Sequence, residues 1–304
     1  MANKVIVICG PTASGKTSLA VELAKKINGE IISADALLVY EGLDIGTAKP
    51  TIQERQGVVH HLIDVVSPKC NFSVSDYARL ALPIVQDLLA KSKTPIICGG
   101  TGFYIQSLLY KSQFGGTGAD EKVRAYYEEI LATHGKAYLH DLLKKVDEES
   151  AQKLHENDTK RVIRALEIYH VTGKKKSLQA DEPVPRFDFA AFSVDYPREV
   201  LYSRIGQRVE QMFEQGLEAE TEALLQNGVE KCAQCMQAIG YKEIIEGRAL
   251  GLDREEIKEL IKKNTRNYAK RQITFFKRMQ NHTYIDGALP LEEKLQKILK
   301  TLAL

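Results

Sequence analysis

The segment Gly10-Pro-Thr-Ala-Ser-Gly-Lys-Thr17 fits the pattern G-x-x-x-x-G-K-[ST] and constrains the fold more than any other feature of this chain. It follows a continuous apolar run, Lys4–Cys9, and leads into Ser14–Ile27, which has apolar residues at helical spacing. Such an apolar run is typical of a strand buried on both faces of a parallel sheet. A strand, a glycine-rich turn and a helix in this order predict a P-loop.

A P-loop binds phosphate groups for physical reasons. Its successive backbone N–H groups form a nest for anions, and the N-terminus of the following helix adds partial positive charge. Lys16 supplies a full charge, and the hydroxyl of Thr17 can ligate Mg²⁺. The predicted phosphate-binding residues are Gly10, Pro11, Thr12, Ala13, Ser14, Gly15, Lys16 and Thr17. The alternative interpretation is a glycine turn that fits the pattern by chance.

The pattern alone leaves open whether the ligand is a triphosphate or a diphosphate. ATPases and GTPases usually hold Mg²⁺ with a second acid at the end of an apolar strand. Here the apolar run Thr94–Cys98 is followed by Gly-Gly-Thr-Gly and has no acid, whereas Asp35 follows the run Glu30–Ala34. This arrangement is atypical of a plain NTPase.

Alternation of apolar runs with helical segments predicts an α/β fold: a P-loop core whose parallel sheet is flanked by helices. Further strands are expected at Asp188–Asp195 and His282–Asp286, and a closing helix at Leu291–Leu304. The segment between Pro197 and Met279 is predicted to be mostly helical.

A glycine-rich stretch, Phe114–Asp120, and a polar, proline-containing stretch, Lys174–Arg186, enclose a charged region with helical character. Both stretches are typical of linkers. The predicted domains are therefore a core at 1–114 and 187–304 and an inserted all-helical domain at 115–186.

Charge and composition limit the surroundings of the protein. The net charge is only +2, but seven bases and no acid lie between Ile261 and Gln280. Such a local basic stripe is the kind of surface that binds a polyanion, although a charge run is often only a solvated helix face. No apolar run is long enough for a transmembrane helix, and five scattered cysteines favour a cytoplasmic protein.

Several segments together resemble one family, the bacterial tRNA dimethylallyltransferases. The resemblance spans about nine-tenths of the chain. The matching segments are GPTASGKT at Gly10–Thr17, IISAD and VYEGLDIGTAKP within Ile31–Pro50, HHLID at His60–Asp64, GGTGFY at Gly99–Tyr104, KRVIRALEIY at Lys160–Tyr169, QAIGYKE at Gln237–Glu243 and TRNYAKRQITFFKR at Thr265–Arg278.

The resemblance implies a reaction in which a dimethylallyl group leaves its diphosphate and joins the exocyclic 6-amino group of the adenine 3′ of the anticodon in tRNA. It implies that the P-loop, with Mg²⁺ at Thr17, holds the diphosphate of dimethylallyl diphosphate. Lys16, Asp35 and Thr101 match catalytic positions of the family, and Arg208 is a further candidate for the diphosphate. From the residues alone, Asp35 could instead be a helix cap or an outer-shell Mg²⁺ ligand, and Thr101 an ordinary N-cap.

The resemblance also implies contacts with the anticodon stem-loop. The expected tRNA-binding residues are Asp35, Ala36, Leu37, Leu38, Thr101, Arg124, Thr159, Lys160, Arg161, Val162, Ile163, Lys270 and Arg271. Many relatives have serine where this chain has Ala36, which leaves the role of Ala36 in doubt. Ion pairing at the surface is the alternative role for Arg161 and Arg164. A monomer is expected.

Two other enzyme classes stay open at this stage. An adenylate isopentenyltransferase acting on AMP, ADP or ATP would share the P-loop and Asp35, but it would have little use for the basic stripe or the helical insertion. A P-loop small-molecule kinase would require a second metal-holding acid. A non-enzymatic RNA chaperone would have no need of an intact Lys16 and Asp35.

Overall fold

The computed structural model describes residues 4–111, 120–178, 184–279 and 282–303, and it divides the chain into two compact units. Unit 1 comprises Met1–Leu109 and Arg186–Leu304, and unit 2 comprises Tyr110–Pro185. The first boundary expected from the sequence, 114/115, lies outside the described residues. Each unit has its own hydrophobic core.

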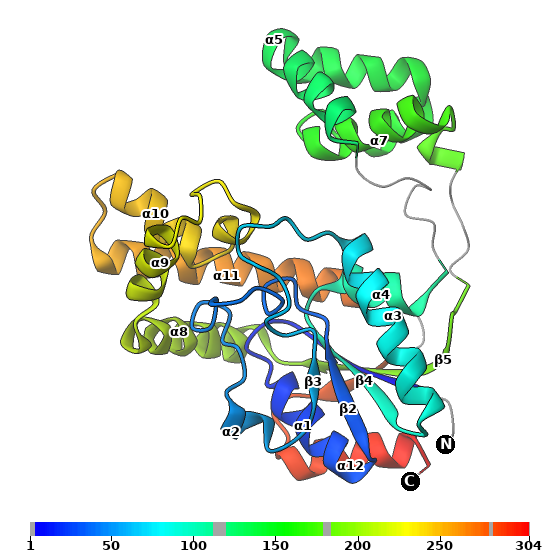
Figure 1. Ribbon diagram of the computed structural model, residues 1–304, viewed down its shortest axis with the longest axis vertical. Helices are drawn as coiled ribbons and strands as arrows, with labels where there is room; N and C mark the ends of the chain where they lie inside the picture. The colour runs from blue at the N-terminus through cyan, green and yellow to red at the C-terminus, as the bar shows by residue number, and fades with distance from the viewer. Residues whose placement is uncertain (1–3, 112–119, 179–183, 280–281, 304) are drawn as a thin grey trace. The chain divides into compact units, whose positions relative to one another are not determined.

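A six-stranded parallel sheet forms the centre of unit 1, with strand order β3-β2-β4-β1-β5-β6 (Figure 1). The predicted α/β class is confirmed. The strands are β1 Lys4–Cys9, β2 Gly29–Ser33, β3 His60–His61, β4 Thr94–Gly99, β5 Asp188–Asp195 and β6 His282–Asp286. Because parallel pairing aligns all strand ends, the loops that follow β1, β2 and β4 meet at one edge of the sheet.

Helices cover both faces of this sheet. Those of unit 1 are α1 Lys16–Lys26, α2 Ile52–Arg55, α3 Val74–Ala90, α4 Gly102–Leu109, α8 Arg198–Gln215, α9 Leu217–Gln226, η2 Gln234–Gln237, α10 Tyr241–Ala249, α11 Arg254–Lys277 and α12 Leu291–Thr301. The crossovers from β1 to β2 and from β3 to β4 run in opposite directions along the sheet. Right-handed crossovers therefore place α1 and α3 on opposite faces.

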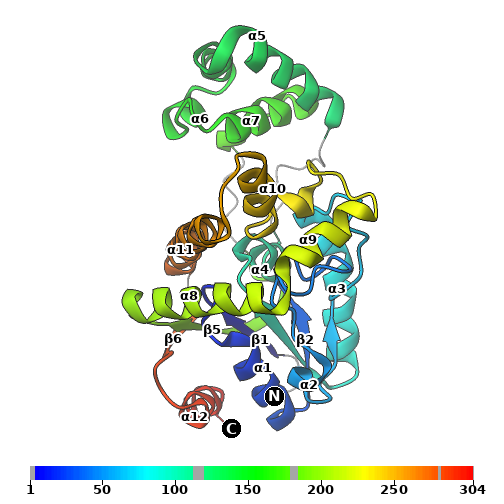
Figure 2. The same cartoon turned by 90° about the vertical axis from the view of Figure 1, so that its left-hand side faces the viewer.

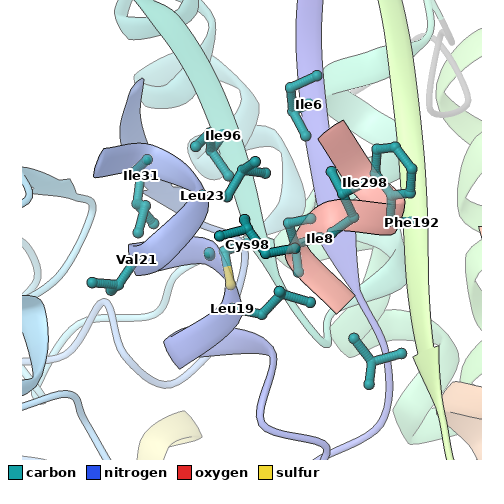
Figure 3. Close-up of a cluster of buried hydrophobic side chains, with 14 of the residues drawn as sticks. Ile6, Ile8, Leu19, Val21, Leu23, Ile31, Ile96, Cys98, Phe192 and Ile298 are labelled. Carbon is teal, nitrogen blue, oxygen red and sulfur yellow. The ribbon is translucent and has the colours of Figure 1, made fainter. Parts of the chain in front are cut away.

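One part of the core of unit 1 lies between the sheet and the helices α1 and α12. Ile6 and Ile8 of β1 pack with Leu19 and Leu23 of α1 and with Ile298 of α12, and all five side chains are buried (Figure 3). Each such side chain contributes roughly 1.5–3 kcal/mol when it leaves water. This packing fixes the start of α1, and hence the P-loop, against the end of β1.

Two helices of the C-terminal part lie beside the P-loop. α8 packs against α11 through Leu201, Ile205 and Ala269, and Ala13 of the P-loop contacts the same cluster (Figure 2). The segment 197–279, which was predicted to be mostly helical, therefore supplies two helices that lie beside the P-loop.

Unit 2 is helical, with α5 Glu121–Val146, α6 Glu148–Lys153, α7 Thr159–Thr172 and η1 Lys176–Leu178. Gly135 interrupts α5 with a φ of 81°. Its core includes Leu139, Leu143 and Leu166. Throughout the described part of the chain, no helix combines the length and the apolar character that a membrane span requires.

Candidate active site

Three loops converge where β1, β2 and β4 end. They are the P-loop after β1, the turn at Asp35 after β2 and the turn at Gly99–Thr101 after β4. Ala34 N–H donates to Cys98 O at 2.7 Å, and Thr101 N–H donates to Ala34 O at 3.0 Å. A Cβ at Gly99 would lie 2.1 Å from Ala34 O, so only glycine allows the two turns this close approach.

The P-loop has the backbone of an anion-binding nest. Gly10, Ala13 and Gly15 have φ values of 146°, 61° and 76°. Gly15 is the N-cap of α1 and no side chain caps this helix end, so its first N–H groups remain available to a ligand. The Oγ of Ser14 is buried and has no hydrogen-bond partner in the described residues. The loop therefore presents donors for a phosphate group.

Lys16 lies at the start of α1 and points back over the loop. Its ammonium donates to Pro11 O at 3.2 Å. Burial lowers the pKa of Lys16, and the carboxylate of Asp35 opposes that shift. A ligand with negative charge would relieve the cost of keeping this ammonium charged, as expected for a residue that binds diphosphate.

Asp35 and Thr101 belong to one hydrogen-bonded unit. Leu37 N–H donates to Asp35 Oδ1 at 3.0 Å, and Ala36 N–H donates to Thr101 Oγ1 at 3.0 Å. Thr101 thus fixes the backbone next to Asp35, and one carboxylate oxygen of Asp35 remains without a hydrogen bond in the described residues. That oxygen can accept a hydrogen bond from a substrate.

A cavity of about 340 Å³ opens beside these loops, and all of its lining residues belong to unit 1. Its polar lining residues include Thr12, Lys16, Asp35, Arg208, Arg271 and Gln272, and its apolar lining residues include Ile205, Val209, Met212, Ile239 and Ile261. Ala36 and Leu37 also line it, whereas Leu38, Thr17 and Thr101 do not. A lining that combines charged and apolar side chains suits a ligand with a diphosphate head and a short hydrocarbon tail.

Arg208 of α8 projects into this cavity. One of its Nη groups donates to Thr47 O at 2.9 Å, while its Nε is buried and has no partner in the described residues. Burial lowers the pKa of Arg208, and Asp35 opposes that shift. An unpaired guanidinium donor in a buried position is costly and points to an anionic ligand.

The loop that holds Thr47 is itself held by a side chain that the sequence did not single out. The carboxylate of Glu220 accepts hydrogen bonds from the N–H groups of Asp44, Ile45 and Gly46 at 2.9, 2.7 and 3.0 Å. Tyr241 donates to the same carboxylate at 2.7 Å. Two motifs that are far apart in the chain, GLDIGTAKP and QAIGYKE, therefore build one support for Arg208.

Tyr241 of α10 lies in the core of unit 1 and does not line the cavity. It is fully buried, and a Cβ at Gly46 would lie 2.5 Å from its ring. Burial, followed by the charge of Glu220, raises the pKa of its hydroxyl. Tyr241 therefore acts on the site through the loop and not by contact with a ligand.

α11 contributes Gln272, which the sequence also did not single out. Its Oε1 accepts from Thr12 N–H and its Nε2 donates to Gly100 O, both at 2.9 Å. On a basic helix, an isolated glutamine gives no sequence signal of such a role. Arg204 of α8 is another unexpected neighbour, because its Nε donates to Ala13 O of the P-loop at 2.8 Å.

The basic stripe of α11 is partly neutralised. Lys262 forms ion pairs with Glu210 and Glu259 at 2.6 and 2.8 Å. Lys270 and Arg271 are exposed, and Arg271 also lies over the ring of Tyr268, 5.7 Å from its centroid. Lys270 and Arg271 are therefore better placed than Lys262 to meet a polyanion.

Four basic residues of unit 2 that the sequence singled out differ in their surroundings, because two are paired with a buried carboxylate and two are exposed. Arg124 and Arg164 form ion pairs at 3.0 and 2.8 Å with Glu167, which is fully buried. The side chain of Arg161 is 68% exposed, and Lys160 is exposed as well.

Burial limits what the segment around Arg161 can offer to RNA. The side chains of Val162 and Ile163 are buried in the core of unit 2, so the contact with tRNA expected for these two residues would be made through their backbone. Side-chain contact from this segment would come from Thr159, Lys160 and Arg161.

Comparison with known proteins places this geometry in a family. The family model described as IPP transferase matches residues 38–279. The tRNA dimethylallyltransferase of Acetivibrio thermocellus is 44% identical over 302 residues, covering 98% of this chain and 96% of that protein. The corresponding protein of Thermoanaerobacter sp. is 44% identical over 310 residues, covering 100% and 98%.

Solved structures of similar fold lead to the same family. The full-length tRNA isopentenylpyrophosphate transferase of Bacillus halodurans shares 40% identity with this chain at a TM-score of 0.75, covering 99% of this chain and 96% of the other. A eukaryotic dimethylallyltransferase acting on tRNA shares 32% identity at a TM-score of 0.80, covering 94% and 74%. With the P-loop, Asp35 and the buried arginine assembled at one sheet edge, this chain belongs to the IPP transferase family.

Proposed function

We propose that this chain is a tRNA dimethylallyltransferase that transfers the dimethylallyl group of dimethylallyl diphosphate to the 6-amino group of the adenine 3′ of the anticodon, releasing diphosphate. The activity is that of its full-length relatives. The observation that carries the assignment to this site is the carboxylate of Asp35, which lines one cavity together with Lys16 and Arg208 and stabilises the charged form of both.

The reaction requires one bond to form and one to break. The adenine N6 forms a bond to C1 of the dimethylallyl group while the C1–O bond breaks, and that electron pair leaves with the diphosphate. N6 then has one proton too many, which passes to Asp35 in this proposal. An adenine amine is a weak nucleophile, so catalysis depends on alignment and on stabilising the leaving group.

The leaving group would lie on the P-loop. Lys16 and Arg208 line the cavity and supply positive charge, and the N–H groups at the start of α1 supply donors beside it. These donors act on charge that develops as the C1–O bond breaks, which is where preorganised donors accelerate a reaction most. Thr101 would act by holding the turn of Asp35 in place.

A magnesium ion fits the donor set. Mg²⁺ prefers oxygen ligands and is often held by one or two protein groups together with substrate phosphates. Thr17 offers a hydroxyl at the start of α1, and the described residues hold no group of three His, Cys, Asp or Glu side chains that could bind a metal without the substrate. When bound, the ion would neutralise part of the diphosphate charge.

We further propose that tRNA meets the exposed bases of α11, Lys270 and Arg271, and those of the predicted helical domain, chiefly Lys160 and Arg161. Arg124 is paired with Glu167, so its side chain would contact RNA only through its remaining donors. A target adenine in a single-stranded loop can leave its stack at a cost of a few kcal/mol. A cytoplasmic monomer is consistent with this proposal.

The test is a transfer assay with labelled dimethylallyl diphosphate on unmodified tRNA and on AMP, with and without Mg²⁺. We expect label on tRNA alone. Label on AMP would assign the chain to the adenylate isopentenyltransferases. Phosphoryl transfer from labelled ATP to a small molecule, with no label on either acceptor, would favour the kinase interpretation.

A further inference from the structure

The side chain of Gln272 joins two loops that have no backbone hydrogen bond to each other among the described residues. Its Oε1 accepts from Thr12 N–H in the P-loop, and its Nε2 donates to Gly100 O in the turn that carries Thr101. Gln272 is only 5% exposed, so both bonds form in a place that water hardly reaches. A buried amide satisfied on both sides is strongly fixed in orientation.

Glycine at position 100 leaves the space that the Gln272 amide occupies. A Cβ at Gly100 would lie 2.2 Å from Nε2 of Gln272, so any other residue at position 100 would displace the side chain. A Cβ at Gly102 would lie 2.2 Å from the ring of Phe275, one turn further along α11. Side chains of α11 therefore pack so closely against this turn that positions 100 and 102 have no space for a Cβ.

We propose that Gln272 is a positioning residue that sets the spacing between the diphosphate-binding loop and the turn of Thr101 and Asp35. This inference rests on the proposed function, because the first loop would hold the leaving group and the second the amine. Gln272 uses both ends of its amide on the backbone, so it acts through these loops. Without it, the two loops would stay joined through the pairing of β1 with β4, which ends at Cys9 and Gly99, but would lose the link between Thr12 and Gly100.

Gln272 also connects the site to the basic surface of α11. Lys270 and Arg271 precede it directly and are exposed, and Arg271 lines the same cavity. The bases that would contact tRNA therefore lie in the same turn of α11 as Gln272, which holds the P-loop. A substitution of Gln272 is expected to weaken diphosphate binding and slow the chemical step while leaving the affinity for tRNA unchanged.

The experiment compares Gln272→Met with a matched control, Asn264→Leu. Gln272→Met removes two amide hydrogen bonds of α11 and Asn264→Leu removes one, which Asn264 donates at 2.7 Å to Glu243 of α10, away from the P-loop. For each variant we would measure the melting temperature, kcat, both KM values and, by calorimetry, the Kd for inorganic diphosphate.

For Gln272→Met we expect the Kd for diphosphate and the KM for dimethylallyl diphosphate to rise about tenfold, because Thr12 N–H and Gly100 O both lose their hydrogen bond to the amide. We expect kcat to fall at least as much, because the amine and the leaving group lose alignment. The KM for tRNA is expected to stay within about twofold, since phosphate contacts on the outer face of α11 are untouched. Asn264→Leu should lower the melting temperature without this pattern.

A second variant, Gln272→Glu, covers the case in which Gln272→Met fails to fold. The ionised carboxylate keeps an acceptor for Thr12 N–H but places a second oxygen against Gly100 O. The protonated acid restores a donor, and burial raises the pKa of such a carboxyl. The ratio of the kcat/KM of Gln272→Glu to that of the wild type should therefore increase as the pH falls.

The proposal is wrong if Gln272→Met matches the wild type in diphosphate affinity and kcat, if Asn264→Leu gives the same pattern, or if the Gln272→Glu ratio does not change with pH. If the wild type itself transfers no label to tRNA, the proposed function fails. The Kd for inorganic diphosphate would then still decide whether Gln272 positions the P-loop.

Discussion

Replacing Arg208 with methionine should separate ligand binding from stability. The side chain keeps its apolar stem but loses a charge that burial already disfavours, as the lowered pKa of Arg208 indicates. It also loses the hydrogen bond to Thr47 O, which is worth about 1 kcal/mol. These two effects oppose each other, so the free energy of unfolding without ligand should stay within about 1 kcal/mol of the wild type.

With diphosphate the balance changes. A charge-assisted hydrogen bond from the guanidinium to a phosphate oxygen contributes about 1.5–3 kcal/mol. The Kd for diphosphate should therefore rise roughly ten- to hundredfold in Arg208→Met. Because bound ligand stabilises a protein by RT ln(1 + [L]/Kd), the rise in melting temperature that diphosphate causes in the wild type should shrink accordingly.

The assay is a thermal melt at a series of diphosphate concentrations, with Arg198→Met as the control. Arg198 lies in the first turn of the same helix and is exposed. The reasoning is refuted if Arg208→Met binds diphosphate as the wild type does, or if it loses several kcal/mol of stability without ligand. The second result would mean that Arg208 is mainly a structural residue.

Three further predictions concern other parts of the molecule. Asp35→Ala should lower kcat far more than it weakens tRNA binding, because its contact matters as the amine attacks; near-normal turnover would contradict its role. Lys270→Ala with Arg271→Ala should weaken tRNA binding and reduce its salt dependence, and an unchanged salt slope would place this face in solvent. Burial raises the pKa of Asp147, but hydrogen bonds from Ser150 and Ser177 outweigh it and lower the pKa to about 2. Because this pKa lies below the unfolded value, the contribution is present at neutral pH and is lost as the pH falls toward 2. Asp147→Asn should therefore cost about 2 kcal/mol of unfolding free energy near pH 7, and the difference from the wild type should narrow in acid.

The elements that hydrophobic patterns encode directly were predictable. The strands β1, β5 and β6 have the bounds expected from their apolar runs, and the P-loop connects β1 to α1 as the pattern requires. No element was expected between Ala34 and Thr94, where the structure has α2, β3 and α3. β3 has only two residues, too few for any periodicity, whereas α3 has a Ser73–Asp76 capping box that gives a readable start signal.

The supporting residues of the site could not be predicted, because their partners are remote in sequence. Gln272 bonds to a residue 260 positions earlier, and Glu220 to residues 174 to 176 positions earlier. In the sequence, Gln272 resembles a polar residue on a solvated basic helix, and Glu220 lies in a helix rich in acids. Only the folded chain shows that both side chains bind backbone groups of the loops around the cavity.

Glu220 allows this remote support to be tested. Its two oxygens accept four hydrogen bonds, three from the backbone of residues 44–46 and one from Tyr241. Glu220→Gln keeps the shape but turns one oxygen into an NH₂ group, which must face backbone N–H donors and leave them unsatisfied. A fully buried unsatisfied donor costs about 1–3 kcal/mol; those of Ile45 and Gly46 are part-buried, so the cost is at the lower end of this range and the loop should move.

The consequence should reach Arg208, since the loop presents the Thr47 carbonyl that orients it. We therefore expect Glu220→Gln to raise the KM for dimethylallyl diphosphate and to leave the KM for tRNA unchanged, although Glu220 does not line the cavity. Tyr241→Phe removes only one of the four bonds and leaves the backbone donors paired, so its effect on the same KM should be smaller. An equal or larger effect of Tyr241→Phe would show that the ring hydroxyl, and not the carboxylate, determines the position of the loop.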